Sequence, residues 1–161
     1  MLKSRGDYID TVILMSGNGL SFQICRMPDD QKSIEEGREA VAGGLRSFNE
    51  NKTHFKPKEI SVFMRDRQNK VVGGAMGYTY GDWFHVSILW VEESFRNREN
   101  GTKLLKMLEN EAAKLGCKHV ETDTFSWQAR PFYEKQGYTL FATLDNCPEG
   151  HKKYFLKKNL P

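Results

Sequence analysis

The spacing of apolar residues changes near Gly101, and this change does most to limit the possible fold. Residues 84–91 fit a strand, whereas Leu104, Leu108 and Ala112 recur at the spacing of one face of a helix. A charged loop, residues 92–100, joins the two segments. A strand that passes through a loop into an amphipathic helix is typical of a strand–helix–strand crossover. The chain is therefore expected to mix helices with a sheet.

The remaining segments extend this pattern. In chain order the sequence predicts a strand, a helix, three strands, a helix, a strand, a short helix and two strands, over residues 20–26, 33–46, 60–65, 70–78, 84–91, 101–115, 120–124, 131–136, 138–144 and 152–156. Short connections between the three middle strands imply an antiparallel meander. We expect an α+β fold: a mixed, mostly antiparallel sheet with helices on both faces.

The first helix is expected to be short. Ser33 and Glu36 have the spacing of a capping box at a helix start. Gly43 and Gly44 each disfavour a helix by about 1 kcal/mol relative to alanine. We therefore expect the helix to break there and residues 47–58 to form a mobile loop.

Length and composition limit the class of protein. The 161 residues, 39% of them hydrophobic, suit one core. The Gly-rich stretch around Gly17 suggests an N-terminal extension, 1–18, before the main domain, 19–161. The net charge of +3 implies no nucleic-acid surface. Cys25, Cys117 and Cys147 form no CxxC pair, which argues against a disulfide framework or a metal site. We expect a cytoplasmic protein without membrane association.

The loop before Gly101 points to a ligand. The first N–H groups of a helix have no partner within the helix, and the helix dipole favours negative charge at that end. A pyrophosphate can accept several of these N–H groups at once. Coenzyme A carries such a pyrophosphate.

Three motifs, in the same chain order, make the sequence resemble the GNAT superfamily of N-acetyltransferases over about residues 19–160. They are Leu89-Trp90-Val91 at a strand end, Arg96-Asn97-Arg98-Glu99-Asn100-Gly101-Thr102 in the loop, and Ser126-Trp127-Gln128-Ala129 followed by Phe132-Tyr133 and Gly137-Tyr138. The resemblance implies that the first motif binds the pantetheine arm of acetyl-CoA, that the second binds its pyrophosphate, and that Ser126 and Tyr133 contact the same molecule.

The loop departs from the family pattern. Glu99 and Asn97 stand where the family usually has glycine, which leaves only Gly101. Glycine suits such positions because backbone amides must approach phosphates closely, sometimes at positive φ. A carboxylate 4 Å from a phosphate would also repel it by about 1 kcal/mol in water. We expect Glu99 either to weaken cofactor binding or to turn outward and pair with Arg96 or Arg98.

Two residues are candidates for catalysis. Tyr133 matches the family position from which a hydroxyl can protonate or solvate the leaving thiolate. His85, with an ordinary pKa near 6.5, is a candidate base for the acceptor amine. Strict alternation places it on the same strand face as Leu89 and Val91. A β-bulge-like opening near Val91 is expected to supply a backbone N–H to the thioester carbonyl.

The resemblance implies an acetyl-CoA-dependent N-acetyltransferase that transfers the acetyl group directly to an amine of a small molecule or peptide. The alternative is a non-catalytic acyl-CoA-binding or interaction module with a degenerate pyrophosphate loop. Relatives in this family are often dimers, so a homodimer is also expected.

Overall fold

The computed structural model describes residues 11–15, 21–25 and 31–161 of the chain. These residues fall into two compact units, Met1–His54 and Phe55–Pro161. Most of the expected extension, residues 1–18, lies outside the described residues. The expectation that residues 19–161 form one domain stays a prediction.

The first unit holds a two-stranded antiparallel sheet and one helix. Strand β1 (Thr11–Met15) pairs with β2 (Ser21–Cys25), and α1 spans Gln31–Thr53. The expected break at Gly43 and Gly44 is wrong, because α1 continues through both. Helix formation is cooperative, so continuing through two glycines costs less than ending one helix and nucleating another. The expected capping box is also wrong, since α1 begins two residues before Ser33.

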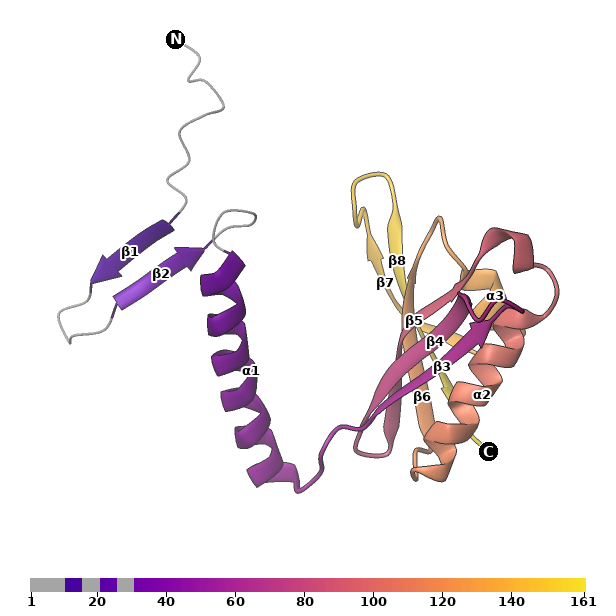
Figure 1. Ribbon diagram of the computed structural model, residues 1–161, viewed down its shortest axis with the longest axis horizontal. Coiled ribbons are helices and arrows are strands. Elements are labelled where there is room, and N and C mark those ends of the chain that lie inside the picture. Colours follow the sequence, from indigo (N-terminus) through magenta and orange to yellow (C-terminus); the bar gives the residue numbers. More distant parts are fainter. Residues whose placement is uncertain (1–10, 16–20, 26–30) are drawn as a thin grey trace, which may run out of the picture. The chain divides into compact units, whose positions relative to one another are not determined.

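The second unit is a six-stranded sheet with two helices (Figure 1). Its elements are β3 (Glu59–Arg65), β4 (Val71–Tyr80), β5 (Trp83–Val91), a short 3-10 turn η1 (Glu93–Phe95), α2 (Asn100–Lys114), β6 (His119–Phe125), α3 (Arg130–Lys135), β7 (Thr139–Asp145) and β8 (Lys152–Asn159). The strand order is β3-β4-β5-β6-β8-β7, and only β5 and β6 run parallel. The predicted α+β class, with its mostly antiparallel sheet, is confirmed.

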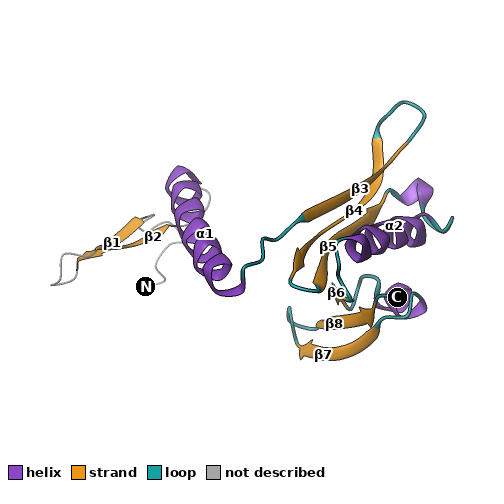
Figure 2. Cartoon of the chain, turned by 90° about the horizontal axis from the view of Figure 1, so that it is seen from below, coloured by secondary structure: helices purple, strands orange, loops and turns teal. Residues whose placement is uncertain are grey.

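Helix α2 packs against β3, β4 and β5, as both ribbon views show (Figures 1 and 2). Its apolar stripe, Leu104, Leu105, Leu108 and Ala112, is buried with Phe84, Val86 and Val120 of the sheet. Burying a leucine of this kind stabilises a fold by about 1.5–3 kcal/mol. Tyr133 of α3 belongs to the same core. The helical spacing that begins after Gly101 therefore orients α2 on the sheet.

A buried polar cluster also ties α2 to the sheet. Glu109 accepts hydrogen bonds from the Tyr138 hydroxyl at 2.9 Å and from Lys158 Nζ at 2.7 Å. Both carboxylate oxygens are therefore satisfied, as a buried charge requires. This cluster fixes the helix relative to the C-terminal strands.

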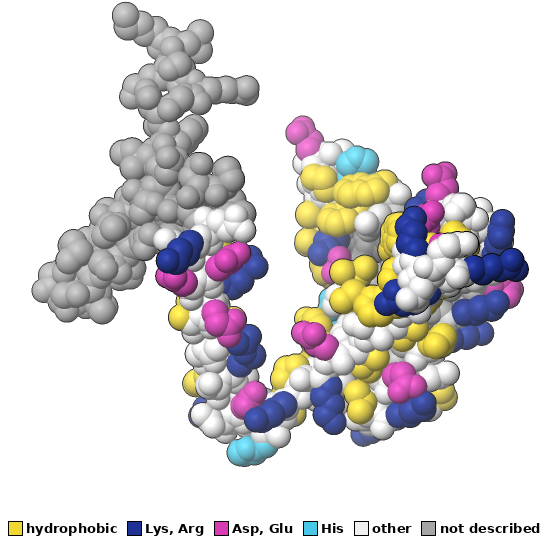
Figure 3. Space-filling model, in the orientation of Figure 1, with side chains coloured by type: hydrophobic (Ala, Val, Ile, Leu, Met, Phe, Trp, Pro, Cys, Tyr) yellow, Lys and Arg dark blue, Asp and Glu magenta, His cyan; other side chains and the backbone are white. Residues whose placement is uncertain are grey.

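The side of the sheet opposite α2 carries several exposed apolar side chains. Phe63, Met76, Ile88 and Trp90 point away from α2 and remain exposed within this unit. In Figure 3, further hydrophobic side chains gather over the β7–β8 end of the sheet, where Phe141 and Leu144 are exposed. No described helix is long and apolar enough to cross a membrane.

Candidate functional site

The two parallel strands in the middle of the sheet separate part-way along their length. Pairing of β5 with β6 runs from Trp83 opposite His119 to Val86 opposite Thr122, and then stops. The Thr122 hydroxyl donates to the Val86 carbonyl at 3.0 Å at this last pair. Beyond it, the main-chain groups of β5 that face β6 have no strand partner. We call this opening the fork.

The fork contains a cavity of about 750 Å³. Its walls come from both strands and from the turn that leads into α3, and they comprise Ser87, Ile88, Leu89, Trp90, Val91, Arg96, Thr122, Asp123, Thr124, Phe125, Trp127, Gln128, Ala129 and Tyr133. The structure therefore brings together the predicted strand-end residues Leu89, Trp90 and Val91 with Tyr133.

A β-bulge reverses the predicted side-chain alternation along β5. Met76 pairs with Ile88 and Gly77 with Val86, so Ser87 is an extra residue on β5. After the bulge, Leu89 and Val91 pack against the core, as Phe84 and Val86 do before it. His85 therefore lies on the face opposite Leu89 and Val91, and the prediction of a shared face is wrong. A bulge adds one residue, which inverts every later position.

The loop before α2 lines a second cavity of about 550 Å³. It is formed by Leu89, Val91, Arg96, Asn97, Glu99, Asn100, Gly101, Thr102, Gln128, Ala129, Pro131 and Phe132. Leu89, Val91, Arg96, Gln128 and Ala129 line both cavities, so the two are adjacent. Arg98 is the one residue of the predicted loop motif that does not line it.

The N–H groups of residues 97–102 donate to no acceptor among the described residues. The first backbone bond of α2 is made by Lys103, to Glu99. Asn97 and Glu99 each have φ 58°, the left-handed conformation that glycine adopts without strain. The loop thus holds two non-glycine residues in a conformation that favours glycine.

Glu99 lines the cavity beside this loop. The expected ion pair with Arg96 or Arg98 does not form in the described part of the chain, where Arg96 Nε instead donates to the Val91 carbonyl at 2.9 Å. Glu99 also makes no side-chain cap of α2. Its carboxylate therefore lies at the helix end that favours an anion, without a cation held against it.

Tyr133 is buried in α3, at 6% exposure, and lines the fork cavity. Burial raises the pKa of its phenol, while contact with the Thr122 side chain acts more weakly in the opposite direction. A raised pKa makes Tyr133 a poorer proton donor than a free tyrosine. Its hydroxyl is better suited to donating a hydrogen bond to developing negative charge than to losing its proton.

Ser126 lines neither cavity. Its Oγ lies 3.2 Å from His151 Nδ1 and accepts the Lys152 N–H at 3.3 Å. Gln128 lines both cavities instead, and its side-chain oxygen accepts the Phe125 N–H at 2.8 Å. Gln128 belongs to the third sequence motif, but residue spacing alone does not show which side chain of this turn lines a cavity.

His85 and Glu121 form a close pair that sequence reasoning missed. His85 Nδ1 lies 2.6 Å from Glu121 Oε1, and the Tyr80 hydroxyl donates to the same oxygen at 3.2 Å. The hydrogen bond to Glu121 raises the pKa of His85, although burial opposes it. The two residues are 36 positions apart, so no local signal could have paired them.

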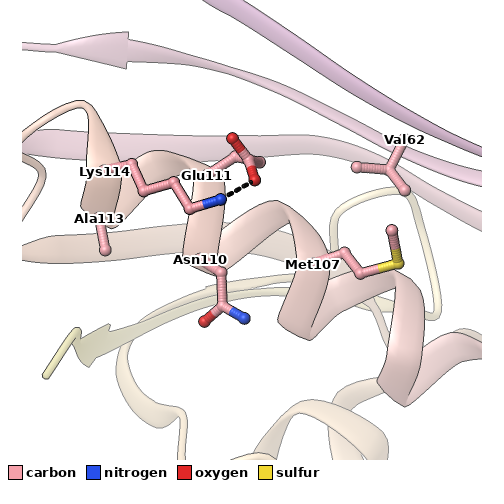
Figure 4. Close-up of a pocket in the computed structure, with 6 residues that line it drawn as sticks. All are labelled: Val62, Met107, Asn110, Glu111, Ala113 and Lys114. Carbon is pink, nitrogen blue, oxygen red and sulfur yellow. Dashed lines mark hydrogen bonds and ion pairs between the residues drawn. The ribbon is translucent and has the colours of Figure 1, made fainter.

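A third cavity, of about 530 Å³, lies between α2 and β3 (Figure 4). Its residues are Val62, Met107, Asn110, Glu111, Ala113 and Lys114. Lys114 Nζ is paired with Glu111 at 2.6 Å, which leaves no free charge on that pair. None of the predicted site residues lines this cavity. The described residues also contain no cluster able to hold a metal ion.

The chain is similar to several known proteins. Residues 24–138 match the model of the acetyltransferase (GNAT) family. An acetyltransferase of Agrobacterium fabrum is 33% identical over 118 residues, which cover 73% of this chain and 83% of that protein. A blasticidin-S acetyltransferase of Streptomyces morookaense is 30% identical over 107 residues, covering 65% and 79%. A solved putative acetyltransferase from Agrobacterium tumefaciens has a TM-score of 0.78 at 28% identity, covering 87% and 99%.

Proposed function

The chain belongs to the GNAT acetyltransferase family, and from this premise we propose that it transfers an acetyl group from acetyl-CoA directly to an amine of a small molecule or peptide. The observation that carries the proposal is the pair of adjacent cavities at the fork and at the α2 loop, which share five lining residues. The two cavities suit the two chemically different parts of coenzyme A. The alternative, a module that binds acyl-CoA without catalysis, is separated from it by the experiment below.

The loop cavity suits a pyrophosphate. Unpaired N–H groups over residues 97–102 can donate to phosphate oxygens, and the start of α2 adds a favourable dipole. Arg96 adds a positive charge beside them. The same cavity is also bordered by the predicted loop residues Asn97, Asn100, Gly101 and Thr102. Arg98 does not line it, and its proposed role is limited to adding positive charge near the loop.

The fork cavity suits an extended amide-containing arm. Leu89, Trp90 and Val91 lie on a stretch of β5 that has lost its neighbour on the β6 side. Strand-like hydrogen bonding to an amide chain satisfies such edge groups. The same unpaired groups can donate to a thioester carbonyl, where negative charge develops during acyl transfer.

Two side chains are assigned chemical roles in this proposal. His85 takes a proton from the acceptor ammonium and passes it to solvent, which leaves a neutral amine that can attack the thioester carbon. When the carbon–sulfur bond breaks, Tyr133 donates a hydrogen bond to the sulfur, which ends as a thiol with the second amine proton. Bound acetyl-CoA supplies the activated acetyl group. Ser126 is assigned a supporting role through the turn that carries Gln128.

The acceptor is assigned only as an amine. The relative from Streptomyces morookaense is named for blasticidin S, a small molecule, which makes blasticidin S the first acceptor to test. A panel of blasticidin S, kanamycin, spermidine and a lysine-containing peptide covers the classes of amine in the proposal.

The test is acetyl-CoA binding by calorimetry, followed by thiol release over the amine panel. We expect binding, and turnover with at least one amine. Tyr133→Phe should lower kcat by about 10- to 100-fold, the cost of one hydrogen bond to a charged group, and leave acetyl-CoA affinity unchanged. Tyr138→Phe, which removes a buried hydroxyl that lines neither cavity, is the control for altered packing.

Three outcomes would contradict the proposal. Binding without turnover on any amine would favour the non-catalytic module. Absence of acetyl-CoA binding would exclude both readings. An equal loss of affinity and turnover in Tyr133→Phe would make Tyr133 a structural residue.

A further inference from the structure

Glu121 is a carboxylate that the reaction described above does not use. It lies opposite His85 in the parallel register of β5 and β6, and its Oε1 is 2.6 Å from His85 Nδ1. We propose that Glu121 is a positioning residue, which holds His85 with its proton on Nδ1 so that Nε2 is the atom facing the acceptor amine. This inference rests on the proposed function.

The pair is held by three strands. The His85 and Glu121 side chains are only 19% and 18% exposed. The Tyr80 hydroxyl of β4 donates to the same Glu121 oxygen, and the Tyr78 ring lies 5.1 Å from the His85 ring. Contacts from both sides restrict rotation of the imidazole. The ring orientation is thus set before any acceptor binds, which reduces the entropy that binding would otherwise cost.

The carboxylate decides which ring nitrogen carries the proton. An ionised carboxylate only accepts hydrogen bonds, so His85 Nδ1 must be the donor. A neutral imidazole has one N–H, which leaves the lone pair on Nε2. Nε2 has no hydrogen-bond partner among the described residues. When Nε2 takes the acceptor's proton, the imidazolium charge is balanced by Glu121, and the proton then leaves from Nε2 to solvent.

The position of the pair at the fork links it to the reaction. His85–Glu121 is the pair directly before Val86–Thr122, where strand pairing ends. Ser87 and Asp123, the residues just beyond that last pair, line the fork cavity. His85 therefore lies two residues before Ser87 in the cavity wall, on the face of β5 opposite the core.

The other charged and titratable groups near His85 do not hydrogen-bond its ring as Glu121 does. Asp123 of β6 is paired with Lys153 of β8 at 2.9 Å, and their opposite charges act on His85 in opposite directions. Tyr78 and Tyr80 of β4 are the remaining titratable neighbours. Burial and the Glu121 carboxylate both raise the pKa of Tyr80, so it stays neutral. Glu121 is the carboxylate that hydrogen-bonds the ring.

The first test is independent of activity. In the full-length protein labelled with ¹⁵N-histidine, long-range ¹H–¹⁵N spectra report the tautomer and the titration of His85. We expect neutral His85 to be protonated at Nδ1, with a pKa above 6.5. Glu121→Ala should shift the population toward the Nε2–H tautomer, which an isolated imidazole prefers, and Glu121→Gln should lower the pKa.

Asp123→Asn is the matched control in the same spectra. It removes a carboxylate from the same strand and face without removing a hydrogen bond to His85, so the Nδ1–H tautomer should persist. An Nε2–H tautomer in the unmodified protein would overturn the proposal. So would a tautomer and titration that Glu121→Ala leaves unchanged.

The second test uses turnover with the best amine of the panel. We expect Glu121→Gln to lower kcat by about tenfold or more, to leave KM for acetyl-CoA unchanged, and to move the acidic limb of the pH profile to lower pH. A variant that is only less stable, with the pH profile of the unmodified enzyme, would show a structural role and refute the proposal. If no amine is acetylated, the proposed function fails, while the spectra still decide how Glu121 holds His85.

Discussion

At the scale of single residues, the loop before α2 places two residues other than glycine in the left-handed conformation. Asn97 and Glu99 both adopt left-handed φ values of 58° where the family usually has glycine. This conformation is less stable by about 1–2 kcal/mol for a residue with a Cβ. Gly101 does not need positive φ, and a Cβ there would meet the Phe132 ring at an ordinary 3.5 Å. The retained glycine is therefore not the one the loop conformation requires.

Replacing Glu99 should tighten cofactor binding. Glu99→Gly removes both the charge and the strained Cβ, whereas Glu99→Gln removes the charge alone. With about 1 kcal/mol of repulsion relieved, the Kd for coenzyme A should fall about fivefold in Glu99→Gln and further in Glu99→Gly, measured by calorimetry at low salt. Unchanged affinity in both variants would mean that the carboxylate lies away from the bound phosphates.

At the scale of elements, the bulge at Ser87 and the order of the last strands decide which side chains meet. The bulge inverts the faces of β5 and separates His85 from Leu89 and Val91. Strand β8 lies between β6 and β7, so the final hairpin is attached to the sheet through its second strand. That arrangement places Lys158 beside Glu109, and Lys153 beside Asp123.

Gly77, opposite the bulge, should be intolerant of any side chain. A Cβ there would collide with the His85 carbonyl oxygen and would lie 2.6 Å from the Phe84 ring. Neither the strand backbone nor a buried ring can move freely, so Gly77→Ala should destabilise the protein by about 2–3 kcal/mol in chemical unfolding. Gly44→Ala in α1 is the control, because a Cβ there meets nothing within 4 Å. Equal unfolding curves for both variants would show that the strands at the bulge can separate.

At the scale of the whole molecule, free energy of unfolding should depend on pH through His85. Glu121 raises the pKa of folded His85 above the value of about 6.5 expected when unfolded. The pair therefore contributes its full stability below pH 6.5 and loses it as pH rises through the folded-state value. The stability difference between the unmodified protein and Glu121→Gln should shrink from pH 6 toward alkaline pH, as urea unfolding can measure. A difference that grows with pH would contradict the pairing.

Much of the fold follows from local pattern. The periodicity near residues 84–91 and after Gly101 predicted β5 and α2, and the turn residues predicted the meander, because helix and strand periods depend only on neighbouring residues. The position of the loop before α2 was predictable for the same reason, as it joins two such segments. Gly43 and Gly44 misled the prediction of α1, because propensity is weak beside cooperative helix formation.

The sequence by itself determined the fold class, most of the elements and the loop that begins α2, since each of these is encoded over a few consecutive residues. Only the tertiary structure decided where β5 and β6 part, which face His85 occupies and that Glu121 is its partner. These features depend on strand register and on one bulged residue, which arise from packing between segments far apart in the chain. A one-residue shift exchanges the two faces of a strand, and no local spacing records it.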